Sequence, residues 1–485
     1  MNYISTRGGR GGVSPSQAIV TGIAADGGLF VPEQLPRLAP AADTSYNEHA
    51  FRCISPYLPD FDAQELRSFI GKAYAGFDTP DVAPLKSFGN LHFLELFHGK
   101  TLAFKDVALS LLPHLMTAAA SKIGDSRKRV ILTATSGDTG KAALEGFKDV
   151  DGVLVIVFYP EHGTSVLQQR MMTTQEGGNV AAIGVRGNFD DAQGEVKRIF
   201  ADRQLAARLD AQGFALSSAN SINIGRLVPQ IAYYYHAYAQ LVGRGMTPGE
   251  EVSFVVPTGN FGNILAGWYA KQMGLPVKKL ICASNENNVL TDFLATGVFD
   301  PGRPFVATIS PSMDILHPSN LERLLFYALG KSPESLLECL NRLNTHGQYS
   351  VNANFSGLAG FSADEQATRQ AIRRVYDRFG YVIDPHTAVA YSAYEQYDGG
   401  EPTVIMSTAS PYKFTKSVMS VLDPASSARD DFELLQRLAE FRRESVPPRL
   451  AGIADKPVLH DQTVDIAEMK DALLRVLNIY STHLH

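Results

Sequence analysis

The stretch "VSFVVPTGNFGNILAGWYA", residues 252–270, places a β-branched apolar run, a loop with two glycines and an apolar segment in direct succession. Residues 252–257 have the composition of a buried strand. Residues 262–273 have a helical pattern, and Gly274 is suited to end that helix. A strand that runs through a short loop into a helix is the repeating unit of a parallel α/β sheet.

The same unit recurs on both sides of this stretch. Upstream, strands are predicted at 129–135, 153–160 and 179–185, and a helical segment follows each of them. A long helix is predicted at about 222–243, before the quoted stretch. Downstream, further strands are predicted at 277–284 and 403–409. This alternation predicts parallel sheets with right-handed crossovers. We therefore expect an α/β fold of two parallel-sheet domains with a cleft between them, preceded by a mainly helical N-terminal segment.

The length of 485 residues is consistent with roughly two to four domains. We predict an N-terminal segment at 1–85 and a first α/β unit at 86–220. A second α/β unit is predicted at 221–430, and helices that cover a surface at 431–485.

Composition narrows the class of protein. The chain is 45% hydrophobic and 19% charged, which is ordinary for a soluble protein. A net charge of −6 without a basic run argues against nucleic acid as a partner. No stretch approaches the roughly 20 apolar residues of a membrane span, and the first residues lack the apolar core of a secretory signal. We therefore expect a cytoplasmic protein without a membrane partner.

The three cysteines are Cys53, Cys282 and Cys339. They lie far apart in the sequence and match neither a CxxC motif nor a zinc-binding spacing. This usage favours a reducing compartment, and no metal site is expected.

The glycine loop is the first candidate site. It comprises Gly259, Asn260, Phe261, Gly262 and Asn263. A loop at a helix N-terminus offers backbone N–H groups and the positive end of the helix dipole to an anion such as phosphate. The pattern is neither GxGxxG nor a Walker loop. A tight turn in which glycines relieve backbone strain is the alternative, and the pattern leaves both open.

A second loop lies in "TATSGDTGKAAL", residues 133–144. Ser136, Asp138 and Thr139 supply two hydroxyls and a carboxylate where a predicted strand gives way to a helix. Ligands of open α/β folds bind at this carboxyl edge of the sheet. The alternative is an N-cap cluster, because Ser, Asp and Thr are favoured caps.

A third loop lies in "SSANSINIGRLVPQ", residues 217–230. Its polar residues are Asn220, Ser221, Asn223 and Arg226. A guanidinium group suits bidentate binding of carboxylate or phosphate. Helix capping with an exposed arginine is the alternative here.

Lys105 occupies an unusual place. It stands in the first turn of a predicted amphipathic helix that starts near Phe104, on the same side as the apolar Ala108, Leu109 and Leu112. The opposite, polar face is predicted to carry Asp106, Ser110 and His114. The helix dipole and apolar surroundings both favour the neutral amine, which is a nucleophile. The alternative is a side chain whose amine reaches water. Together with two candidate anion loops, the lysine indicates a cofactor with an aldehyde and a phosphate, namely pyridoxal 5′-phosphate (PLP).

Several motifs in order resemble the threonine synthase family, PLP-dependent enzymes of fold type II in the tryptophan-synthase-β-like class. They are "YISTRGG", "HGKTLAFKD", "TATSGDTGKAA", "SANSINIGR", "PTGNFGNILAG", "DPHTAVAY" and "STASPYKF". The resemblance covers nearly the whole chain. It implies a lyase that converts O-phospho-L-homoserine and water to L-threonine and phosphate, the last step of threonine biosynthesis.

The resemblance also implies roles for residues. Lys105 would form a Schiff base with PLP, residues 259–263 would hold its phosphate, and Asp138 would lie near its 3′ oxygen. Thr408 would hydrogen-bond the pyridine nitrogen. The substrate would be bound by Ser136, Thr139, Asn220, Ser221, Asn223 and Arg226. Ser410 stands where many relatives have histidine and receives no role, and His386 is expected to be structural.

Two other functions remain open at this stage. One is a related PLP-dependent O-phosphohomoserine phospholyase that releases a keto acid. The other is a phosphoester-binding relative without catalysis, which would not require Lys105. We expect a monomer or weak homodimer.

Overall fold

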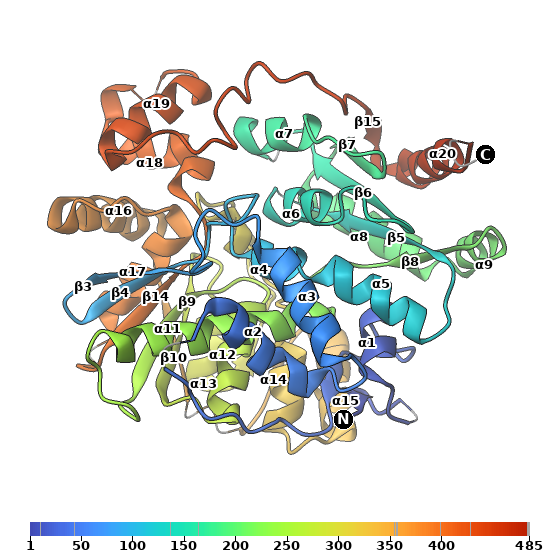
Figure 1. The fold of residues 1–485 in the computed structure, drawn as a ribbon, viewed down its shortest axis with the longest axis horizontal. Helices are drawn as coiled ribbons and strands as arrows, with labels where there is room; N and C mark the ends of the chain where they lie inside the picture. The colour runs from blue at the N-terminus through green and yellow to red at the C-terminus, as the bar shows by residue number, and fades with distance from the viewer. Residues whose placement is uncertain are drawn as a thin grey trace.

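Two largely parallel sheets form the framework of the protein, shown as a computed structural model in Figure 1. The structure describes residues 1–9, 11–42, 44–135, 137–162, 164–353, 355, 357–397, 399–426 and 428–482. The first sheet has the order β15-β7-β6-β5-β8 and is parallel throughout. Its strands are β5 (Lys128–Ala134), β6 (Val153–Pro160), β7 (Val180–Arg186), β8 (Phe214–Ser217) and β15 (Thr463–Asp465).

The second sheet has the order β13-β10-β9-β14-β4-β3. Its neighbours are parallel except for β3, which pairs antiparallel with β4. Its strands are β3 (Leu85–Phe88), β4 (Leu91–Glu95), β9 (Val252–Pro257), β10 (Val277–Ser284), β13 (Leu358–Ser362) and β14 (Thr403–Ser407). Two small antiparallel pairs are β1 (Tyr3–Ser5) with β2 (Phe30–Pro32) and β11 (Val298–Phe299) with β12 (Tyr349–Ser350).

Helices cover the sheets, and several of them carry or adjoin the candidate site residues. Those around the site are α4 (Lys105–Leu109), α5 (Leu112–Lys122), α6 (Asp138–Gly146), α7 (Val166–Thr173), α10 (Ile224–Leu227), η2 (Val228–Gln230), α11 (Ile231–Gly243), α12 (Gly262–Met273), η3 (Pro311–Met313), α14 (Leu321–Ala328), α17 (Pro385–Gln396) and η4 (Pro411–Phe414). The others are α1 (Pro15–Thr21), α2 (Tyr46–Ile54), η1 (Ser55–Tyr57), α3 (Ala63–Tyr74), α8 (Phe189–Ala201), α9 (Arg203–Ala211), α13 (Val289–Thr296), α15 (Pro333–His346), α16 (Glu365–Phe379), α18 (Thr415–Leu422), η5 (Pro424–Ser426), α19 (Asp431–Arg442), η6 (Ile466–Glu468) and α20 (Met469–Thr482).

The predicted α/β class with parallel sheets and a helical N-terminal segment is confirmed. Every residue of β6 and of β9 is buried, as expected for parallel strands that are covered on both faces. In the N-terminal segment, α1 packs on α5 and α2 packs on α11. Figure 1 shows α2 and α3, in blue, on the face toward the viewer, and α1 below α5.

Two strands do not belong to the sheet that the predicted domain boundaries imply for them. Strand β4 falls in the predicted unit 86–220, but it pairs with β14 in the second sheet. Strand β15 falls in the predicted helical segment 431–485, but it pairs with β7 at the edge of the first sheet. The reason is that a local apolar pattern identifies a strand without identifying its partner. The predicted domain boundaries stay predictions.

The helix that carries Lys105 is shorter than predicted. It ends at Leu109, and α5 starts at Leu112 with Pro113 in its first turn, where proline is tolerated. Asp106, expected on a polar face, is only 3% exposed. Its carboxylate accepts hydrogen bonds from the backbone N–H of Thr101 at 2.7 Å and from the Thr101 hydroxyl at 2.6 Å. These bonds compensate for the burial of the carboxylate.

The single long helix predicted at 222–243 is likewise interrupted. The segment forms α10, then the short η2 with Pro229 in its first turn, then α11. Proline has no N–H to continue the helical hydrogen bonds, so the break falls at this residue.

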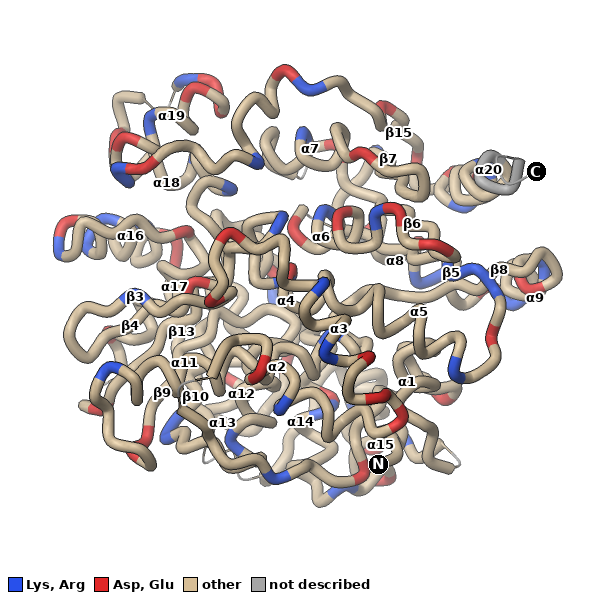
Figure 2. Tube along the Cα trace, in the orientation of Figure 1, with Lys and Arg blue, Asp and Glu red and all other residues tan. Residues whose placement is uncertain are grey.

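Charge, helix hydrophobicity and cysteine burial are those of an ordinary globular protein across the described residues. Basic and acidic residues are interspersed along the trace, with both signs on most elements of the surface (Figure 2). None of the helices in the described ranges has the length and apolar character that a membrane span needs. Cys53, Cys282 and Cys339 are buried and carry free thiols.

The close approach of α6 to α4 gives a test of the fold. A Cβ atom on Gly146 would lie 2.3 Å from the backbone oxygen of Leu109, so Gly146→Ala must push the two helices apart. We expect it to lower the free energy of unfolding by about 1–3 kcal/mol, measured by urea denaturation.

The matched control is Gly194→Ala in α8, where a Cβ atom would meet nothing within 4 Å. Alanine favours the helix there, so this variant should gain about 0.5–1 kcal/mol. Equal urea midpoints for the two variants would contradict the predicted packing.

Candidate active site

The candidate loops gather at the carboxyl ends of the strands. Because β5 and β8 are parallel neighbours, the loops that follow them emerge side by side. The hydroxyl of Thr133, near the end of β5, donates to Oδ1 of Asn220, which follows β8, at 2.9 Å. The second and third loops predicted from sequence are therefore adjacent.

The second sheet brings the other predicted residues to its own carboxyl edge. Strands β9, β14 and β4 are parallel neighbours, and they lead into the glycine loop, Thr408 and the segment before Lys105. The backbone N–H of Phe104 donates to the Thr408 carbonyl oxygen at 2.8 Å. This bond places Lys105 at the end of β14.

Lys105 and Asp138 form a buried ion pair. Lys105 Nζ lies 3.1 Å from Asp138 Oδ2 and 3.4 Å from Ser312 Oγ. The side chains of Lys105 and Asp138 are 10% and 4% exposed. The alternative that the Lys105 amine reaches bulk water is therefore wrong for this structure.

Asp138 has three further partners. Lys413 Nζ lies 2.5 Å from Asp138 Oδ1, and its side chain is 0% exposed. Gln168 Nε2 donates to the same oxygen at 2.8 Å, and the Ser312 hydroxyl donates to Oδ2 at 3.2 Å. One carboxylate thus neutralises part of the charge of two buried lysines.

The pKa values follow from burial and from these charges. Burial lowers the pKa of Lys105, the carboxylate of Asp138 raises it, and the charges of Lys413 and Arg226 lower it, with a net decrease. Burial raises the pKa of Asp138, but Lys105 and Lys413 outweigh burial and hold that pKa well below its usual range. The site therefore pairs a firmly ionised carboxylate with an amine that loses its proton more readily than a free lysine.

Ser312 joins the lysine to the rest of the site. Its backbone N–H donates to His386 Nε2 at 3.2 Å. An imidazole that accepts at Nε2 carries its proton on Nδ1, and Asp384 Oδ2 lies 2.6 Å from that nitrogen. Asp384 and His386 thereby fix η3 against Lys105, which agrees with the structural role expected of His386.

The glycine loop presents a row of free N–H groups. No acceptor in the described part of the chain bonds the backbone N–H groups of residues 259–264. Phe261 adopts a left-handed conformation with φ of 64°, and α12 begins at Gly262. Several unbonded N–H groups at the start of a helix form a site for an anion.

The geometry explains two residues of this loop. A Cβ atom on Gly259 would lie 2.4 Å from the backbone oxygen of Ser312, so only glycine lets η3 approach the loop. The Asn263 side chain is held by its Oδ1, which accepts from the hydroxyls of Tyr233 at 2.7 Å and Tyr234 at 2.8 Å. The backbone N–H of Asn263 and its buried Nδ2 have no acceptor among the described residues.

The residues of the third loop lie in two different surroundings: Ser221 is next to the glycine loop, whereas Arg226 and Asn223 form hydrogen bonds with other parts of the protein. Ser221 lies beside the glycine loop, since a Cβ atom on Gly262 would be 3.8 Å from Ser221 Cβ. Arg226 is buried, and its Nη1 donates to the Ala219 carbonyl at 2.5 Å. Its Nε has no partner in the part of the chain that the structure describes. Burial lowers the pKa of Arg226 to about 10. Asn223 caps α10 through the Gly225 N–H at 2.9 Å and donates to the Ile19 carbonyl at 3.0 Å.

Three predicted residues remain. Ser136 lies outside the described residues. Thr139 is half-buried in the first turn of α6, next to Asp138. Thr408 is buried directly after β14, and its backbone bond to Phe104 keeps it beside Lys105.

Sequence reasoning missed Gln168, Ser312 and Lys413. Lys413 lies within the motif "STASPYKF", where a lysine among apolar residues was a usable signal. The backbone N–H of Ser410 donates to the Leu102 carbonyl at 3.0 Å, and its hydroxyl caps the short helix η4 that carries Lys413. Gln168 and Ser312 have no local pattern that singles them out.

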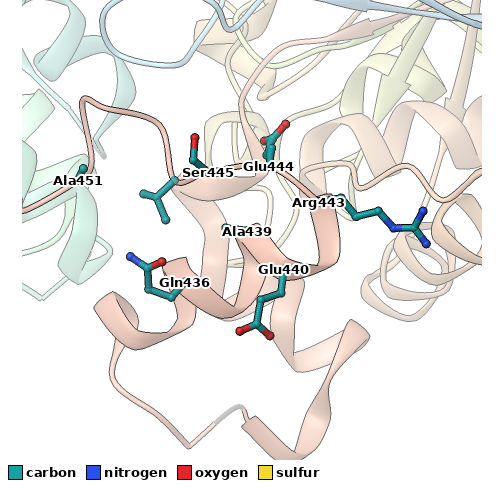
Figure 3. A pocket seen from close by; sticks show the side chains of 8 residues that line it. Gln436, Ala439, Glu440, Arg443, Glu444, Ser445 and Ala451 are labelled. Atoms are coloured by element: carbon teal, nitrogen blue, oxygen red, sulfur yellow. The ribbon is translucent and has the colours of Figure 1, made fainter.

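A separate surface pocket of about 550 Å³ lies at the C-terminal end of α19 (Figure 3). It is lined by Gln436, Ala439, Glu440, Arg443, Glu444, Ser445, Val446 and Ala451. None of these residues contributes a hydrogen bond or an ion pair to Lys105 or Asp138. The pocket is not the site built around the lysine.

The residues present fit PLP. A buried amine with a lowered pKa suits capture of an aldehyde, and the unbonded N–H groups at the start of α12 suit a phosphate. Among the described residues, no cluster of three or more His, Cys, Asp and Glu side chains could hold a metal ion.

Known proteins show the same assembly of segments. The family model "Threonine synthase N terminus" matches residues 2–74, "Pyridoxal-phosphate dependent enzyme" matches 84–409, and "Threonine synthase, C-terminal" matches 387–472. Threonine synthase of Pseudomonas aeruginosa is 40% identical over 435 residues, which cover 86% of this chain and 90% of that protein.

Longer relatives and solved structures also match. Threonine synthase-like 1 of Homo sapiens is 42% identical over 433 residues, which cover 84% of this chain but only 58% of that protein. A PLP-bound threonine synthase from Brucella melitensis superposes with a TM-score of 0.87 at 34% identity, and the match covers 98% of each chain. The chain therefore belongs to the threonine synthase family of pyridoxal-phosphate-dependent enzymes.

Proposed function

We propose that the protein converts O-phospho-L-homoserine and water to L-threonine and phosphate, the last step of threonine biosynthesis. The observation that carries this proposal is the buried Lys105 amine, with Asp138 at 3.1 Å and a row of free N–H groups nearby. P. aeruginosa threonine synthase, which matches over most of its length, supports the same reaction. A cytoplasmic location and a monomer or weak homodimer stay predictions.

In this proposal Lys105 would hold PLP covalently, and the backbone N–H groups of residues 259–263 would bind its phosphate. Asp138 would interact with its 3′ oxygen, and Thr408 would hydrogen-bond its pyridine nitrogen. When bound, PLP accepts the electrons left on a substrate carbon after a proton is removed. The backbone bond that places Thr408 beside Lys105 supports its assignment.

Lys105 is the proposed acid and base. A primary amine transfers protons best when its pKa approaches the working pH, and burial moves the pKa of Lys105 in that direction. Asp138 and Ser312 hold Lys105 Nζ in place through contacts at 3.1 and 3.4 Å. The amine therefore has a fixed position from which to take a proton from the substrate and to return it.

The anionic groups of the substrate need cations or N–H donors. Arg226 is buried, forms no ion pair with a described carboxylate and has a free Nε, so it suits the substrate phosphate. Asn220, Ser221 and Thr139 are the proposed polar contacts around it, together with Ser136. Asn223 supports the loop as a helix cap, because both ends of its amide bond the protein.

Burial of the site also excludes bulk water from the proposed reaction. Lys105 and Asp138 are almost inaccessible to water, which strengthens the electrostatic interactions of the site. A substrate must enter between the two sheets, so we expect the units to separate for binding and to close for catalysis.

Product analysis tests the reaction itself. We expect the PLP-loaded protein to release phosphate from O-phospho-L-homoserine and to form threonine in equal amount, measured by phosphate assay and amino-acid chromatography. Equal release of 2-oxobutanoate in place of threonine would identify a phospholyase. Binding without phosphate release would identify a phosphoester-binding relative.

Replacement of the lysine tests the cofactor. Lys105→Ala should abolish the visible absorbance of the lysine-linked cofactor and lower turnover by at least about 1,000-fold, because covalent attachment and proton transfer are both lost. The control is Lys100→Ala, whose side chain is 48% exposed and pairs with Glu145. Full turnover in Lys105→Ala would exclude the assignment.

The charges around Lys105 predict that its pKa will shift in opposite directions in two variants. Asp138 raises the pKa of Lys105, so Asp138→Asn should lower it; Lys413 lowers that pKa, so Lys413→Met should raise it. A free amine reacts only when deprotonated. The pH midpoint for acetylation of Lys105 by a trace of acetic anhydride, whose reactive form does not change with pH, should therefore fall in cofactor-free Asp138→Asn and rise in cofactor-free Lys413→Met.

We expect each shift to be about 1–3 pH units, the usual effect of a charge at this distance. Peptide mass spectrometry of the Lys105 peptide gives the extent of reaction at each pH. Shifts in the same direction in both variants would refute the proposed balance of charges.

A further inference from the structure

Arg323 joins three segments of the chain, two of which lie beside the glycine loop. Its guanidinium is 0% exposed and lies on α14. Nε donates to the Phe30 carbonyl in β2 at 2.9 Å, and Nη2 donates to the Ile222 carbonyl in the third loop at 2.5 Å. Nη1 donates to Oδ1 of Asn320.

Asn320 connects Arg323 to the glycine loop. Its backbone N–H and its Nδ2 each donate to the Asn260 carbonyl oxygen, both at 3.1 Å. Because Oδ1 of the amide is bonded to Arg323, Nδ2 must face Asn260. Arg323 thereby sets the direction in which the Asn260 carbonyl points.

The direction of that carbonyl fixes the next N–H group. No cis peptide bond occurs among the described residues, and in a trans peptide the C=O and the following N–H point in opposite directions. With the Asn260 oxygen turned toward Asn320, the Phe261 N–H is turned away from it. That N–H is one of those in the loop without an acceptor among the described residues.

The charge of Arg323 is unbalanced inside the protein. Its three acceptors are neutral oxygens, and it forms no ion pair with any carboxylate of the described ranges. The neighbouring Glu322 pairs instead with Arg7 at 2.8 Å. A buried charge is costly without an opposite charge, and an anion in the glycine loop would supply one through a single intervening residue, Asn320.

We propose that Arg323 is a positioning residue for the phosphate of the cofactor, acting through Asn320 on the loop 259–263. It also ties the N-terminal segment to that loop, through Phe30. The inference rests on the proposed function of the loop as the phosphate site.

Two cofactors that differ only in the phosphate test this inference. The dissociation constants of PLP and of pyridoxal are measured by absorbance titration of the full-length, cofactor-free protein. Lysine has one compact ammonium group and cannot reach all three acceptors, so Arg323→Lys should weaken PLP binding at least about tenfold. Pyridoxal binding should change less than about twofold, because it has no phosphate.

Asn320→Ala is the second variant, and it tests the same inference if Arg323→Lys does not fold. It removes the side-chain bond to Asn260 and leaves Arg323 its two backbone acceptors, so we expect the same selective loss of PLP affinity. The control is Arg7→Ala, which breaks the ion pair to Glu322 on the same helix without a contact to Asn260. Its ratio of the two dissociation constants should equal that of the unchanged protein.

Two results would overturn the inference, and they are distinct. Equal weakening of PLP and pyridoxal in Arg323→Lys and Asn320→Ala would show a general structural role and leave the phosphate loop intact as a proposal. Equal affinity for PLP and pyridoxal in the unchanged protein would show that the loop does not bind phosphate, and both proposals would fail.

Discussion

The carboxylate of Asp138 is the constraint on which the site depends. It bonds or pairs with Lys105, Gln168, Ser312 and Lys413, which lie on four separate elements. Asp138 and Gln168 belong to the helices α6 and α7 of the first sheet, whereas Ser312 and Lys413 come from short helices that follow the second sheet. Breaking a buried ion pair on one side leaves the other charge without compensation, which is strongly unfavourable. The carboxylate therefore fixes how the two units meet, and it fixes Lys105 at the place where they meet.

Local sequence was sufficient wherever function follows from one strand, its loop and its helix. The segment 252–273 predicted strand β9, a glycine-containing loop and helix α12, and the structure has all three. Lys105 was predicted in a buried first turn of a helix because apolar residues share its side, and the structure confirms its burial. The loop at Asp138 was predicted at a sheet edge, and it emerges there beside the loop that contains Asn220. These features depend on periodicity and on turn residues, which neighbouring residues encode.

Features that depend on distant partners could not be read in the same way. Asp106 was expected on a polar face, but two hydrogen bonds from Thr101 allow it to be buried. Strand β4 has the pattern of any buried strand, and nothing in it specifies pairing with β14 more than 300 residues later. Ser312 contacts Lys105 because Asp384 and His386 hold η3 beside it. The resemblance to a known family carried over the motif residues, but it could not supply these contacts.

The charges inside the protein and on its whole surface have opposite effects on an anionic ligand. A net charge of −6 repels phosphate esters at long range, although salt screens this repulsion beyond a distance of about 8 Å. Inside, Lys105 and Lys413 share Asp138, while Arg226 and Arg323 bond neutral oxygens. Coulomb attraction is several times stronger in such a buried setting than in water. Attraction for a phosphate therefore arises only after the ligand has left bulk solvent and met the loops, so the free N–H groups and the buried cations decide which anion binds.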